Sequence, residues 1–256
     1  MAVIEEVVRP AVSSAERLPL VRMGARRLGV WLAVAGWASM VLMWITGSAT
    51  IFGHHQEGIP ASTAIGLFLV GWVVMVAAMM LPSSLGTLDR VDRSGAAVGR
   101  LASPRFMAGY FLAWAAFGAV AFAGDGILHV AVERMSWIGE RPSLIAGGVA
   151  MFAGTAEFLG RTPPPAFPSV PPGGGPFALG RAHALDRIRR CWPLMLFAMA
   201  VGMSSPLWMV GLTAVMALEL RPRASAALRL IGIAVFAVGV AVVIEPGWMP
   251  VLLGTA

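Results

Sequence analysis

Residues 63–81 read TAIGLFLVGWVVMVAAMML and contain no charged side chain. A helix needs roughly 20 apolar residues to cross a hydrocarbon core of about 30 Å, because lipid offers backbone N–H and C=O groups no partner. Five other stretches have a similar character, and we place the six spans at 28–52, 63–85, 106–132, 142–160, 193–218 and 228–248. The sequence therefore predicts an all-α fold, a polytopic membrane bundle of about six transmembrane helices.

Composition supports the same fold class. Hydrophobic residues make up 58% of the chain and charged residues 12%, proportions that lie outside the usual range of soluble domains. The formal charge of +6 comes from arginines between the apolar stretches, since the chain contains no lysine. We interpret these arginines as orientation signals of a membrane protein, and expect no nucleic-acid partner.

The distribution of arginine predicts the topology. The bias of cytoplasmic loops toward positive charge places residues 1–27, 90–105 and 161–190 in the cytoplasm, and residues 53–62 and 134–141 outside. We therefore expect a multi-pass protein of the bacterial inner membrane, with a cytoplasmic segment at 1–27 and the helix bundle at 28–256. The Pro/Gly-rich loop at 161–190 is expected to end in a short basic helix at 182–190.

The fifth apolar stretch conflicts with a simple topology. Six full crossings would place Arg221, Arg223 and Arg229 outside, where arginines are unexpected. One alternative is that the stretch is a re-entrant pair of half-helices, broken at Ser204-Ser205-Pro206. We favour a single kinked span, because about 26 apolar residues readily form one tilted helix.

Two segments resemble the DUF2182 family of predicted metal-binding membrane proteins, which are copper-chaperone-like. The segment from Trp72 to Pro82, WVVMVAAMMLP, is similar to that family's W-x-x-M-x-x-A-M-M-x-P signature. The second, CWPLM at 191–195, is followed by Gly202, Trp208-Met209 and Glu219, as in the family pattern. The resemblance implies a membrane bundle that handles copper or another soft metal.

The chain also departs from the family pattern. The family has a cysteine cluster before the tryptophan, whereas this chain has Arg189-Arg190-Cys191 and a single cysteine in total. The family's M-N-L is replaced by Ser204-Ser205-Pro206. Because thiolates hold soft metals firmly, the loss of the other cysteines weakens the implied metal role.

Sulfur atoms recur at helical spacing in two of the spans. Cys191, Met195, Met199 and Met203 follow one another every four residues, so they share one face of a helix. Met75, Met79 and Met80 form a second group, and thioethers with a thiolate suit Cu(I). Unbranched methionine also fills irregular gaps between helices, which explains these stripes without a metal.

Imidazoles and acids gather on the predicted outer side. Asp125 and His129 lie one turn apart at the outer end of the third span, and His54 and His55 lie in the preceding outer loop. These groups suit Cu(II), Zn(II) or a proton relay, although solvated residues at a membrane interface need no special role. Asp125 is the strongest candidate, because an acid inside a span is costly unless it is neutral, paired or hydrated.

The sequence predicts no enzyme, because it has no phosphate-binding loop, no nucleophile elbow and no H-E-x-x-H motif. The leading hypothesis is a membrane protein that handles copper, or another soft metal, in a chaperone or delivery role. The first alternative is an accessory subunit of a membrane-bound oxidase or monooxygenase complex, and the second is a proton-coupled carrier of a small solute. The expected partners are the lipid bilayer, other subunits of a membrane complex, or a copper enzyme.

Overall fold

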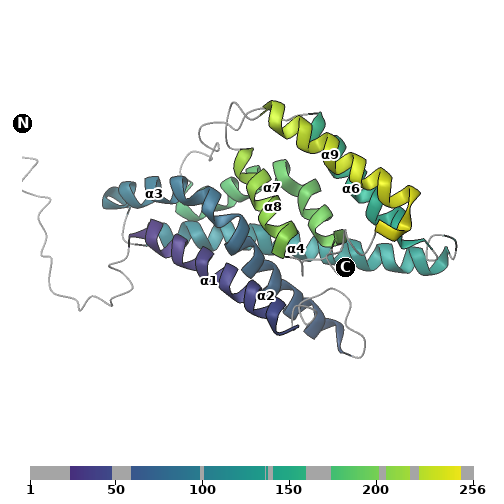
Figure 1. Cartoon of the computed structure of the whole chain (residues 1–256). Coiled ribbons are helices and arrows are strands. Elements are labelled where there is room, and N and C mark those ends of the chain that lie inside the picture. Colours follow the sequence, from purple (N-terminus) through teal and green to yellow (C-terminus); the bar gives the residue numbers. More distant parts are fainter. Residues whose placement is uncertain are drawn as a thin grey trace, which may run out of the picture.

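The computed structural model describes residues 24–47, 59–98, 101–135, 137, 141–159, 174–201, 206–219 and 225–248, and these are helical with short connections and no strand. Figure 1 shows the helices as one bundle. In chain order they are α1 (Ala25–Ile45), α2 (Ala61–Met79), α3 (Leu81–Val98), α4 (Ala102–Arg134), α6 (Pro142–Phe158), α7 (Pro176–Val201), α8 (Pro206–Leu218), α9 (Ser225–Ile244) and the 3-10 turn η3 (Pro246–Trp248).

Four of these helices are long and apolar enough to cross a membrane, namely α1, α2, α4 and the segment Ala226–Ile244 of α9. Helix α6 is shorter, with 17 residues, and α8 has an apolar core of Trp208–Leu218. The structure is therefore compatible with a multi-pass membrane protein, but the predicted count of six spans is not confirmed.

Helices α2 and α3 follow each other with Met80 between them, and together they run antiparallel to α4. The indole nitrogen of Trp72 on α2 donates to the carbonyl oxygen of Trp114 on α4 at 2.9 Å. At the far end, Asp92 on α3 accepts a hydrogen bond from Ser103 on α4 at 3.3 Å. Asp92 also accepts from the backbone N–H of Ala25 at 3.3 Å, so this one carboxylate joins α1, α3 and α4.

Helices α6 and α9 form the most extensive helix pair, and glycines set their separation. A Cβ atom built on Gly154 would lie 2.6 Å from the carbonyl oxygen of Gly232, and one on Gly147 would lie 2.7 Å from that of Gly239. Small residues allow helix backbones to approach this closely. The pairing of Gly154 with Gly232 and of Gly147 with Gly239 also shows that α6 and α9 are antiparallel.

The predicted single kinked span at 193–218 is wrong. Phe197 on α7 packs edge-on against Trp208 on α8, with ring centroids 5.4 Å apart. Further from the break, the guanidinium of Arg187 donates to the carbonyl oxygen of Met216 at 3.4 Å. Helix α8 therefore runs back along α7, and the two form a hairpin, which is the backbone arrangement that the re-entrant alternative requires.

The basic helix predicted at 182–190 is also longer than expected. Helix α7 begins at Pro176 and continues without interruption into the apolar stretch that contains Pro193. The reason is packing: Gly180 meets the backbone of Phe106, and Gly109 meets that of Phe177, so α7 lies directly on α4. Tertiary contact thus extends the helix into a segment whose composition alone predicts a loop.

Candidate metal-handling site

Helix α7 carries the sulfur stripe predicted from the sequence, and the stripe faces the protein interior. Cys191 and Met195 are fully buried, and Met199 is 7% exposed. A residue at every fourth position of a helix returns to nearly the same face. The burial shows that this face packs inside the bundle.

The second sulfur group lies at the junction of α2 and α3. Met75, Met79 and Met80 are all at most 2% exposed. They belong to the same contiguous core cluster as the buried sulfurs of α7. The structure thus brings both predicted sulfur groups into one core, which also contains Met107, Met209 and Met216.

A hydrogen-bonded polar cluster that the sequence analysis missed adjoins these sulfurs. The Nε2 atom of His183 on α7 lies 3.1 Å from the hydroxyl of Ser84 on α3. Ser84 in turn donates to the Tyr110 hydroxyl on α4 at 3.3 Å, and its hydroxyl lies 3.4 Å from the carbonyl oxygen of Met80. Ser84 and Tyr110 are completely buried, so three helices meet at this cluster.

A signal for this cluster was present in the sequence. His183 and Arg187 extend the four-residue repeat of Cys191, Met195 and Met199 backward by two turns. Composition hides this continuation, because the arginines at 181–190 predict a basic cytoplasmic segment that is separate from the apolar stretch. The stripe on α7 therefore carries an imidazole, a guanidinium and a thiol before its thioethers.

His183 is held neutral at physiological pH. Its burial against the rings of Phe106 and Tyr110 disfavours the charged form, and the nearby guanidinium of Arg187 disfavours it further. Together they lower the pKa of His183 to about 4, although Asp186 opposes the shift. A neutral imidazole is the form that binds metals.

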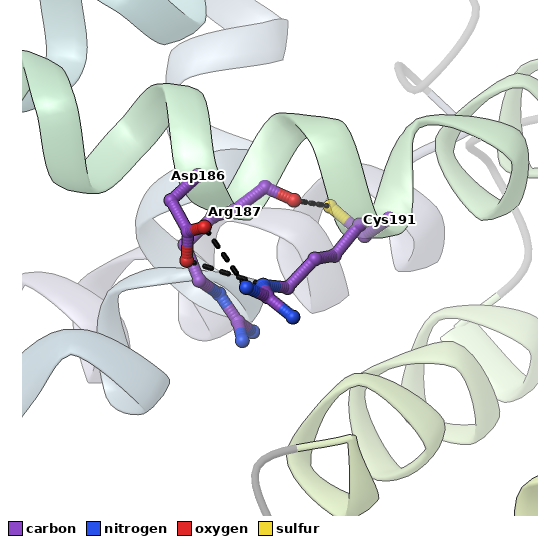
Figure 2. Close-up of polar contacts among 4 residues, drawn as sticks. Asp186, Arg187 and Cys191 are labelled. Carbon is purple, nitrogen blue, oxygen red and sulfur yellow. Dashed lines mark hydrogen bonds and ion pairs between the residues drawn. The ribbon is translucent and has the colours of Figure 1, made fainter. Parts of the chain in front are cut away.

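Arg187 and Cys191 lie one turn apart on α7, as Figure 2 shows. The Sγ atom of Cys191 donates to the carbonyl oxygen of Arg187 at 3.1 Å. Asp186 does not pair with Arg187, because its carboxylate binds Arg190 at 3.0 Å and 3.1 Å. Asp186, the acid nearest in sequence to the buried Arg187, is thus paired with Arg190 instead.

The structure does not bring Asp125 and His129 to the methionines of α2. Asp125 is half-buried and His129 is exposed, toward the end of α4. Asp125 lies about 16 Å further along α4 than Trp114, which contacts α2 beside the methionines. Three other predicted ligands, His54, His55 and Met203, lie outside the described residues.

Within the part of the chain that the structure describes, no three His, Cys, Asp or Glu residues come together as a possible metal site. The donor set is instead one buried thiol, several buried thioethers and one partly buried imidazole, on α2, α7 and the junction between α2 and α3. Such soft donors favour Cu(I) over the harder divalent metals.

Comparison with known proteins gives one match. The chain matches the family model PpoB2, described as copper chaperone, over residues 69–161 and 169–242. A search of curated proteins finds no relative, and a search of solved structures finds no similar fold. The matched regions cover more than half of the chain and contain both sulfur groups, so this protein belongs to the PpoB2 copper chaperone family.

Proposed function

We propose that this protein is embedded in the bacterial inner membrane, binds Cu(I) among the sulfurs of its helix bundle, and passes the ion to a copper enzyme. It would act as a carrier of the metal and catalyse no reaction itself. The observation that carries the proposal is the buried stripe of Cys191, Met195 and Met199 on α7, which shares one core with Met75, Met79 and Met80.

The choice of metal follows from the donor types. Thioethers and a thiolate are soft ligands, and a monovalent soft cation needs less compensating charge in an apolar interior than a divalent one does. Membership of the copper chaperone family supports the same choice. The DUF2182 signatures at 72–82 and 191–219 both lie inside the matched regions, and we propose that the two descriptions concern the same group of proteins.

The arginines support an orientation in which the start of α7 faces the cytoplasm. Asp125 and His129 then lie toward the opposite surface, where they are candidates for a site of metal entry. Copper would enter near α4 and leave near the basic end of α7, next to a soluble or membrane-bound enzyme that requires it.

The test is Cu(I) binding by the purified full-length protein in detergent, measured by competition with a chromophoric Cu(I) chelator. The variant Cys191→Ala/Met195→Leu/Met199→Leu keeps the helix apolar but removes three sulfurs. We expect at least about tenfold weaker binding, because the softest donors are lost. The matched control, Met40→Leu/Met43→Leu/Met151→Leu, removes three thioethers that are only partly buried, and should bind like the wild type.

Equal copper affinity in the α7 variant and the wild type would overturn the proposal.

Co-purification distinguishes copper delivery from the alternative role as an accessory subunit. A protein that purifies with a fixed complement of oxidase or monooxygenase subunits and without copper would support the accessory role.

A further inference from the structure

Two exposed arginines lie beside the closest approach of α4 and α7. A Cβ atom built on Gly109 of α4 would lie 3.1 Å from the backbone nitrogen of Arg181 on α7. One built on Gly180 would lie 3.1 Å from the Cα atom of Phe106. Arg105 is one helical turn before Gly109, and both arginines are exposed. The glycine contact therefore fixes two cationic residues close together on neighbouring helices.

Both arginines lie on the side of the α4–α7 pair that faces away from α3. Helix α3 reaches the pair through Ser84, which bonds to Tyr110 on α4 and to His183 on α7. At 3.6 residues per turn, Arg105 is rotated by about 140° from Tyr110 around the axis of α4. Arg181 is rotated by about 160° from His183 around the axis of α7. The two arginines therefore share one exposed surface, opposite the polar cluster.

The charges of this arginine pair are not balanced within the part of the chain that the structure describes. Neither Arg105 nor Arg181 forms an ion pair or a hydrogen bond through its guanidinium there. Asp186, the nearest acid in sequence on α7, binds Arg190 instead. Two adjacent guanidiniums attract an anion, and their forked N–H groups match the oxygens of a phosphate.

An exposed apolar stripe on α4 begins next to Arg105. The following segment, Phe106–Gly124, contains no charged residue, so Arg105 lies where α4 enters the apolar region. Ala108, Leu112 and Ala116 are exposed, and their spacing of three and four residues continues the face that carries Arg105. A positive surface at the end of an apolar stripe matches the two parts of a phospholipid, its phosphate and its acyl chain.

We propose that Arg105 and Arg181 bind the phosphodiester of an anionic phospholipid, whose acyl chain lies along Ala108, Leu112 and Ala116. An anionic headgroup fits better than a zwitterionic one, because the cation of a zwitterionic headgroup is repelled by the two arginines. The bound lipid would link the first turns of α4 and α7. This inference rests on the membrane location proposed above, and it does not require copper.

The test uses the metal-free full-length protein in dodecyl maltoside micelles. Phosphatidylglycerol, or phosphatidylcholine with the same acyl chains, is titrated into the micelles. Native mass spectrometry counts the bound lipid, and the melting temperature is recorded. We expect phosphatidylglycerol to remain bound and to raise Tm by about 3 °C more than phosphatidylcholine does, because a ligand that binds only the folded state stabilises it.

Charge variants define the site. Arg105→Gln/Arg181→Gln should weaken phosphatidylglycerol binding by about tenfold and remove the Tm difference, since both attractions to the phosphate are lost. Arg105→Lys/Arg181→Lys keeps the charges but loses the forked geometry, and should show an intermediate preference. The matched control, Arg134→Gln/Arg141→Gln, removes two exposed arginines at the end of α4 and just before α6, and should behave like the wild type.

Three results would overturn the proposal. One is an equal effect of the two lipids on the wild type, and another is an unchanged preference for phosphatidylglycerol in Arg105→Gln/Arg181→Gln. The third is a Tm shift from soluble glycerol 3-phosphate as large as that from phosphatidylglycerol, which would show a site for free phosphate esters. Failure of copper binding would leave the lipid site standing, and failure of lipid binding would leave the copper proposal standing.

Discussion

A neutral imidazole inside the bundle makes folding depend on pH. The pKa of His183 falls to about 4 in the folded protein, from the ordinary value of 6.5, because of burial and the neighbouring Arg187. Below pH 6.5 the unfolded chain binds a proton at this residue that the folded protein does not bind. The contribution of His183 to the free energy of unfolding is therefore fully present above pH 6.5 and is lost as the pH falls toward 4.

The variant His183→Gln should flatten this dependence. Between pH 7 and pH 5 the wild type should lose about 2 kcal/mol of unfolding free energy through this residue, and the variant should lose correspondingly less. Melting temperatures in detergent at pH 7, 6 and 5 measure the difference. His129→Gln, at an exposed histidine on α4, is the control and should keep the wild-type slope. Parallel slopes in His183→Gln and the wild type would contradict the assignment.

Residue spacing predicts which side chains share a helix face better than it predicts their partners on other helices. The four-residue repeat predicts that Cys191, Met195 and Met199 share one face, and the structure shows that this face is buried. The contact of His183 with Ser84 could not be predicted, because it joins residues 99 positions apart on different helices. The spacing of residues within one helix carries no information on which face of another helix packs against that helix.

At the scale of whole elements, glycine decides how closely two helices pack. Gly154 on α6 faces the backbone of α9, where a Cβ would lie 2.5 Å from the nitrogen of Phe236. Gly148, on the same helix, has open space at the position of its Cβ. The two residues are chemically identical, so they form a matched pair for mutation.

We expect Gly154→Ala to force α6 and α9 apart and to destabilise the protein by about 1–3 kcal/mol, since overpacking displaces backbone. Gly148→Ala should be neutral or slightly stabilising, because alanine favours the helix and meets no neighbour. Unfolding in detergent micelles by a chemical denaturant measures both. Equal effects of the two substitutions would show that the glycines do not set this interface.

The α7–α8 hairpin shows why the length and hydropathy of an apolar segment do not determine whether it forms one span or a hairpin. Residues 193–218 are apolar enough for one span, and the same residues supply a hairpin when a break falls near the middle. Two signals did point to the hairpin: the Ser204-Ser205-Pro206 sequence, and arginines that one crossing would leave on the wrong side. The distribution of arginine predicts the path of this segment better than hydropathy does, because it indicates the side of the membrane on which each end of the segment lies.

At the scale of the whole molecule, the hairpin changes the topology. Helix α6 pairs along its length with α9, so it crosses the membrane if α9 does. We then expect five crossings, α1, α2 with α3, α4, α6 and α9, together with one hairpin that enters and leaves on the same side of the membrane. This topology would place Arg221, Arg223 and Arg229 on the side of the other arginine-rich segments, and so would remove the conflict in the six-span topology.

The two topologies differ in the side on which η3 lies. In a Cys191→Ala background, single cysteines at the exposed positions Thr46, Gly175 and Gly247 can be labelled from either face of the membrane with an impermeant maleimide. Five crossings with a hairpin place Gly247→Cys on the same side as Thr46→Cys and opposite Gly175→Cys. Six crossings would place Gly247→Cys with Gly175→Cys instead, because each full crossing reverses the side. Labelling of Gly247→Cys together with Gly175→Cys would therefore reject the re-entrant hairpin.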